Sequence, residues 1–143
     1  MNERKFPKSP RETTKGIIYF PRMLDKIRMH LAGELHEDYH ANFGTPQTAD
    51  SALCNFLRVN HRVLIERVKQ GGTDEEILEW CFEKGRKPNE GDIFVWNNFM
   101  SKLGWRDPIT PRLEARKQAA GIADRGDIQC IPDLIDWDEE RIK

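Results

Sequence analysis

The sequence contains no apolar run long enough to cross a membrane. Its longest apolar stretches fall well short of the roughly 20 residues that span a bilayer. Its basic N-terminus is not followed by the apolar region of a secretory signal. We therefore expect a cytoplasmic protein with no membrane partner.

Cysteines and catalytic motifs are also scarce. Cys54, Cys81 and Cys130 are odd in number and form no CxxC pair, which argues against a disulfide framework or a structural zinc site. The chain has no GxSxG turn, no glycine-rich phosphate loop and no cysteine with an evident histidine partner. We expect three reduced thiols and no cofactor.

The composition is that of a soluble globular protein. Of 143 residues, 33% are charged, 38% hydrophobic and 9% aromatic, which sets the chain apart from disordered and membrane proteins. This length can bury one adequate core but hardly two. We predict a single helical domain over residues 1–143, with residues 1–8 mobile.

The spacing of apolar residues predicts an all-α fold of about six helices, with an irregular N-terminal segment and a docked C-terminal tail. The clearest helix runs from Phe20 to Leu35, and Pro21 suits its first turn. Its apolar residues recur every three or four positions, so that they form one stripe along a helix. The stripe consists of Phe20, Leu24, Ile27, Leu31 and Leu35.

Other helix starts are marked by side chains that can accept a free backbone N–H. They are Thr48 or Asp50, Asn60, Thr73, Asn89, and Asp107 or Thr110. Ser9-Pro10-Arg11-Glu12 has the form of a capping box and predicts another helical turn or two before Gly16. We expect Val63 and Phe99 to face the core, and a short helix near Pro132 to dock back on the domain.

Charge is unevenly distributed along the chain. Residues 1–30 hold eight lysines and arginines against three acids, whereas the other 113 residues hold 15 bases and 21 acids. The basic segment is either an arm for an external anion, such as nucleic acid or phosphate, or a layer that pairs with the acidic C-terminus. We favour the second reading, because the matching acids are in the same chain. The segment also lacks the interleaved aromatics of a nucleic-acid platform.

The string His36-Glu37-Asp38-Tyr39-His40 matches the HExxH pattern of zinc hydrolases. On an α-helix the two histidines would share a face and bind zinc, with the glutamate as general base. Against this reading, the string follows Gly33 and runs into the turn-like segment 42–46. The alternative is a polar segment that follows the helix and carries surface histidines.

Four segments resemble a bacterial family catalogued as domain of unknown function 5069. They are SPRET (Ser9–Thr13), PRMLDKIRMHLAGEL (Pro21–Leu35), TDEEILEW (Thr73–Trp80) and GDIQCIPDLIDWDEER (Gly126–Arg141). The resemblance implies a soluble single-domain protein with no assigned activity. The positions that match the family's pattern are Ser9, Pro10, Arg11, Glu12, Pro21, Arg22, Asp25, Lys26, Arg28 and Asp127. The two histidines are not part of that pattern, and Gly126 stands where the family usually has a threonine.

We therefore predict a binding or interaction module rather than an enzyme. The predicted binding residues are Arg11, Arg22, Asp25, Lys26, Arg28 and Asp127. The arginines would hold a small anion, a carboxylate or phosphate, in bidentate fashion, or they would contact a protein partner. The alternative function is a zinc-dependent hydrolase that uses His36, Glu37 and His40.

Overall fold

The computed structural model describes residues 4–143 and is mostly helical, as predicted. Its described part has seven α-helices and one 3-10 helix, rather than about six helices, together with a two-stranded sheet. The strands are β1 (Thr13–Thr14) and β2 (Ile17–Ile18). The helices are α1 (Phe20–Leu31), η1 (Glu37–Asn42), α2 (Ala49–Leu57), α3 (His61–Lys69), α4 (Asp74–Lys84), α5 (Glu90–Ser101), α6 (Thr110–Ala119) and α7 (Ile131–Asp138).

The segment before α1 forms a hairpin, so the predicted helical turns after Ser9 are wrong. Its two strands are antiparallel, with Lys15 and Gly16 at positive φ of 48° and 79° in the connecting turn. Such turns match the twist of a hairpin, and β-branched residues at all four strand positions favour extended backbone. Ser9 Oγ still accepts a hydrogen bond from the Arg11 N–H, but it closes only one turn.

Helix α1 is shorter than predicted. It ends at Leu31, and Gly33 adopts a left-handed φ of 71° just beyond it. Phe20, Leu24 and Ile27 are fully buried, which confirms the apolar stripe over these positions, whereas Leu31 is partly exposed. Leu35 is buried from the loop that follows the helix.

Four predicted caps are confirmed. Thr48, Asn60, Thr73 and Asn89 each accept a backbone N–H at the start of α2, α3, α4 and α5. Thr73 and Asn89 also belong to complete capping boxes, in which an acid three residues later returns a bond to the cap. The longest of the helices in residues 4–143 has 12 residues, and none of them could cross a membrane.

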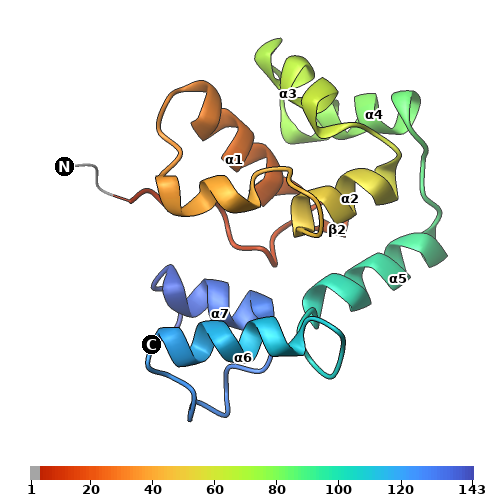
Figure 1. The fold of residues 1–143 in the computed structure, drawn as a ribbon. Helices are drawn as coiled ribbons and strands as arrows, with labels where there is room; N and C mark the ends of the chain where they lie inside the picture. Colours follow the sequence, from red (N-terminus) through yellow and green to blue (C-terminus); the bar gives the residue numbers. More distant parts are fainter. Residues whose placement is uncertain (1–3) are drawn as a thin grey trace.

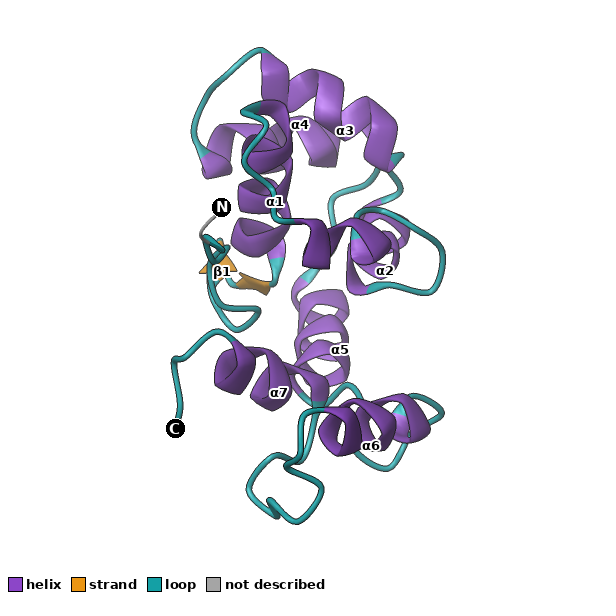
Figure 2. Cartoon of the chain, turned by 60° about the vertical axis from the view of Figure 1, so that its left-hand side comes forward, coloured by secondary structure: helices purple, strands orange, loops and turns teal. Residues whose placement is uncertain are grey.

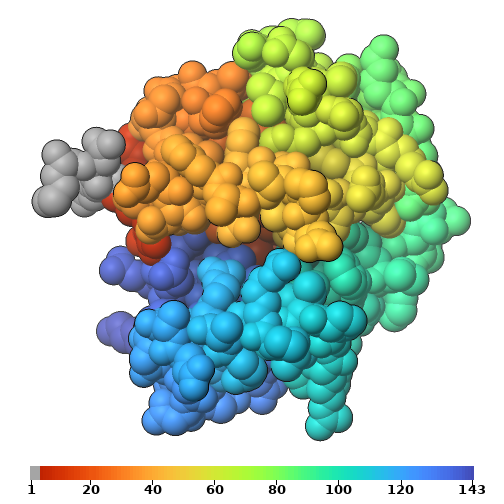
Figure 3. Space-filling model, in the orientation of Figure 1, coloured from red at the N-terminus to blue at the C-terminus, as the bar shows by residue number. Residues whose placement is uncertain are grey.

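The apolar core has two parts. The larger cluster joins α1–α5 and the hairpin, and the smaller one lies between α6 and α7, around Leu113, Ile128, Ile131 and Leu134. Helix α5 runs from the α1–α4 body towards the α6–α7 pair (Figures 1 and 2). The N-terminal segment, red in Figures 1 and 3, lies between α1 and α7. The N-terminal segment from residue 4 onwards and α7 therefore meet where the two parts adjoin.

Residues 1–3 lie outside the described part of the chain, so the predicted mobility of residues 1–8 stays a prediction. Residues 4–8 make polar contacts with later segments. Arg4 Nη2 donates to the Asp138 carbonyl at 2.8 Å, and Arg141 donates to the Pro7 carbonyl. The three cysteines are free and buried.

Candidate functional site

Helix α1 places Arg22 and Lys26 one turn apart, and both side chains are buried. A spacing of four residues puts them on one side of the helix, beside the apolar stripe. Each cation meets a carboxylate from another element within 3.0 Å. The predicted binding residues at the centre of α1 are therefore already occupied by acids of the same chain.

Arg22 forms a bidentate ion pair with Glu139, the residue that follows α7. Both nitrogen–oxygen distances are 2.8 Å. Tyr39 Oη and Arg141 Nη1 also donate to the Glu139 carboxylate, at 2.9 and 2.7 Å. Burial opposes ionisation of Glu139, but these hydrogen bonds, chiefly the one from Arg22, outweigh it and hold the pKa of Glu139 below its usual value. The carboxylate is thus charged and fully engaged.

Ser9 and Arg11 contact two acids of α7 that lie about one and two turns before Glu139. Ser9 Oγ donates to Asp136 at 2.9 Å, and Arg11 reaches both Asp136 at 3.1 Å and Asp133 at 2.7 Å. These contacts confirm that the basic N-terminal segment pairs with the acidic tail. We call the whole contact the seam. It consists of Ser9, Arg11, Arg22, Tyr39, Asp133, Asp136, Glu139 and Arg141.

Lys26 belongs to a second cluster, which lies within the α1–α4 body. Its ammonium is 3.0 Å from Asp50, whose carboxylate also accepts from Tyr19 Oη at 2.6 Å and the Gly44 N–H at 3.0 Å. Burial lowers the pKa of Lys26, and the nearby Asp50 only partly offsets this effect. His61 Nε2 lies 3.8 Å from Asp50, and burial lowers its pKa as well. We call these five residues the Lys26–Asp50 cluster.

The remaining predicted binding residues are dispersed. Arg28 pairs with Asp74 at 2.6 Å, and Asp25 accepts the Lys8 N–H at 3.0 Å. Asp127 is exposed and bonds to Arg125 at 2.8 Å in the loop between α6 and α7, which lowers the pKa of Asp127 to about 2. The tail therefore brings other acids to the arginines.

Sequence reasoning missed several of the partners at these sites. Tyr39 and Asp50 carried no signal for these roles, because a lone tyrosine or aspartate is typical of any surface, and Asp50 was predicted only as a possible helix cap. The acids of α7 did carry one, in the local excess of negative charge, but their individual roles depend on which side of the helix faces α1. The missed residues are Tyr19, Tyr39, Asp50, Asp133, Asp136, Glu139 and Arg141.

A known protein-family model matches almost the whole chain. The family model described as Domain of unknown function (DUF5069) matches residues 4–141. The chain belongs to this family. A search of curated proteins finds no matching sequence. The DUF5069 match spans both the N-terminal segment and α7, so the seam lies within the family domain.

The HExxH string of this DUF5069 chain is not an α-helix. Residues Glu37–Asn42 form a 3-10 helix, in which three residues complete a turn, so positions four apart do not share a face. His36 Nδ1 accepts the Asp38 N–H at 3.1 Å, and His40 Nε2 contacts the Leu35 carbonyl at 3.1 Å. In residues 4–143 no three His, Cys, Asp or Glu side chains gather as a metal site. The geometry gives the zinc alternative no support.

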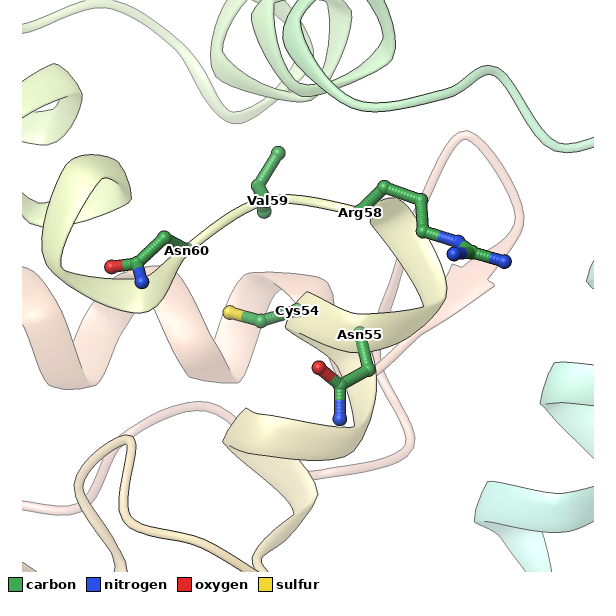
Figure 4. A pocket seen from close by; sticks show the side chains of 5 residues that line it. All are labelled: Cys54, Asn55, Arg58, Val59 and Asn60. Atoms are coloured by element: carbon green, nitrogen blue, oxygen red, sulfur yellow. The ribbon is translucent and has the colours of Figure 1, made fainter.

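A shallow pocket lies at the turn between α2 and α3 (Figure 4). It is lined by Cys54, Asn55, Arg58, Val59 and Asn60, and Arg58 extends away from Cys54 and Asn60. Burial raises the pKa of the Cys54 thiol to about 12, so that thiol is not a nucleophile at neutral pH. Asn60 is engaged as the cap of α3. The pocket therefore offers no reactive group.

The outer face of α5 carries several exposed apolar side chains. Phe94, Val95 and Phe99 are 70%, 66% and 46% exposed, although Trp96 and Met100 on the opposite side are buried. The prediction that Phe99 faces the core is thus wrong, because nearly half of this residue is exposed. Trp105, just beyond the helix, is also exposed. The prediction for Val63 is wrong too, since this α3 residue is 51% exposed.

Proposed function

We propose that this DUF5069 protein is a non-enzymatic interaction module that binds a protein through the outer face of α5. The observation that carries the proposal is the adjacent exposure of Phe94, Val95 and Phe99 on a helix whose other side is already packed. Full burial of such a side chain from water contributes about 1.5–3 kcal/mol, and covering the part of each that is still exposed contributes a share of that. Contiguous apolar surface of this kind is typical of protein contacts.

The charges on α1 argue against a small anion as the ligand. An external anion at Arg22 or Lys26 would have to displace a buried carboxylate, and breaking a buried ion pair costs about 3–5 kcal/mol. We therefore assign the seam to holding α7 on the body. Anion binding by the six predicted residues stays a prediction, with the partly exposed Arg11 and Arg28 as its most accessible cations.

The test is photo-cross-linking in cells that produce the protein. p-Benzoylphenylalanine is placed at position 95 or, as a matched control, at position 63, since both positions are exposed valines on helices. We expect protein adducts from position 95 and few from position 63. Absence of adducts at position 95, in a protein that melts normally, would contradict the proposal.

A further inference from the structure

We propose that the partner of the α5 outer face is a second copy of this chain, with the two α5 helices packed antiparallel. The inference rests on the proposed function, because it names the occupant of the same face. Its basis is the order of residues along α5, with acids at the start, apolar residues in the middle and bases just after the end. In a second, antiparallel copy this order places the acids of one chain beside the bases of the other. A two-fold symmetric contact requires such self-complementarity, since the same patch is used twice.

The two ends of helix α5 carry opposite charges. Glu90 and Asp92 lie in the first turn, whereas Lys102 and Arg106 follow the last. Within residues 4–143, Glu90 and Lys102 are exposed and neither takes part in an ion pair, although Asp92 pairs with Arg86. An antiparallel second copy sets Glu90 of each chain beside Lys102 of the other. A parallel pair would instead bring like charges together.

The apolar residues lie between these charges. Glu90 and Lys102 are twelve positions apart, or about 18 Å at the α-helical rise of 1.5 Å per residue. Phe94, Val95 and Phe99 fall within that length, so a two-fold axis that crosses the outer face at the height of position 96 places them at the centre with one ion pair at each end. An apolar centre with a charged rim is the usual anatomy of a protein interface. Antiparallel packing also sets the helix dipoles in opposition, which is favourable.

Charge complementarity also selects a second copy over partners of one charge sign. A strongly acidic segment would be repelled at the Glu90 end, and a strongly basic one at the Lys102 end. One helix pair forms a small interface, and contacts below about 1,200 Å² in total are typically weak and reversible. We therefore expect a monomer–dimer equilibrium that shifts with protein concentration.

Sedimentation velocity on the full chain tests this assembly. Across a wide concentration series, the wild type should move from the monomer mass of 16.7 kDa towards twice that mass. Val95→Glu should remain monomeric throughout, whereas Val63→Glu, the matched change on α3, should dimerise like the wild type. A wild type that stays monomeric at all concentrations would overturn the inference.

Charge reversal tests the antiparallel arrangement. Glu90→Lys or Lys102→Glu alone should weaken dimerisation by about tenfold, because each change places like charges at both ends of the interface. The double variant should restore it, and Glu75→Lys on α4 should have no effect. Failure of the double variant to restore dimerisation would overturn the antiparallel arrangement.

The cross-linking experiment separates this inference from the proposed function. Adducts from position 95 with twice the chain mass support both. Adducts of other masses, together with a monomeric wild type, overturn the second copy as partner but leave the protein-binding face intact. Absence of any adduct, with a monomeric wild type, overturns both.

Discussion

Two buried ion pairs on α1, one turn apart, have different structural consequences. Arg22–Glu139 joins positions 117 residues apart and fixes α7 against the body, whereas Lys26–Asp50 joins positions 24 apart and completes the interior of the body. The first uses a planar guanidinium that matches a carboxylate at two points. The second uses a compact ammonium that reaches the carboxylate from one side.

The electrostatic settings of the two cations also differ. Burial opposes the charge of Arg22, but the hydrogen bonds with Glu139 outweigh it, and the pKa of Arg22 is raised. Burial also opposes the charge of Lys26, and there it prevails over Asp50, so that the pKa of Lys26 is lowered. Similar burial thus leads to opposite shifts, because the bidentate pair compensates for lost water better. We infer that Arg22 is the better stabilised of the two buried cations. The Lys26–Asp50 cluster is therefore the one more easily disrupted.

The largest effect is expected from breaking the interior pair. Lys26→Met leaves the Asp50 carboxylate buried with neutral partners, which should lower the free energy of unfolding by about 3–5 kcal/mol. Urea denaturation measures it. Lys26→Met combined with Asp50→Asn should regain at least half of the loss, because the amide oxygen can accept from the Gly44 N–H while the amide NH2 donates to the Tyr19 hydroxyl. A loss below about 1 kcal/mol in the single variant would contradict this assignment.

A smaller loss is expected at the seam. Arg22→Met should cost about 2–4 kcal/mol, because Arg141 and Tyr39 still donate to Glu139. Hydrogen exchange should show α7 losing protection while α2 and α3 keep theirs. Arg28→Met, on the same helix with a partly exposed pair, is the matched control and should cost less than about 1 kcal/mol. Uniform loss of protection along the chain would show that Arg22 does not act on α7 specifically.

The smallest effect is a difference in pH dependence. His61 has a pKa below 6.5, so its contribution to stability is complete above pH 6.5 and is lost as the pH falls through its folded pKa. Glu139 has a pKa below 4.5, so its contribution is complete above pH 4.5 and is lost below its own folded pKa. Thermal melts from pH 8 to pH 3 should therefore show two successive losses. His61→Gln should remove the first loss, and Glu139→Gln should reduce the second, to which Asp127 also contributes. A single shared transition would contradict the separation.

The zinc motif shows why a short pattern can mislead. HExxH binds metal only when the backbone is α-helical, and the pattern itself does not specify the backbone. Here Gly33 ends α1 ahead of the motif, and residues 37–42 wind as a 3-10 helix. The residue of the string with a clear structural role is Tyr39, whose hydroxyl donates a hydrogen bond to Glu139 in the tail.

Local features of this protein follow directly from its sequence. The caps Thr48, Asn60, Thr73 and Asn89 and the apolar stripe of α1 follow from contacts between residues within about four positions, and these depend little on the rest of the fold. The pairing of a basic start with an acidic end was also predictable, from charge totals alone.

Which distant residues meet depends on the packing of whole elements. Glu139 rather than Asp127 binds Arg22, because the docking of α7 turns one side of that helix towards α1. Tertiary packing likewise left Phe99 partly exposed, since the neighbours of α5 cover only one side of it. Partners this far apart in sequence are chosen by the fit of whole elements, which no local pattern encodes. The same packing created both the seam and the uncovered face of α5.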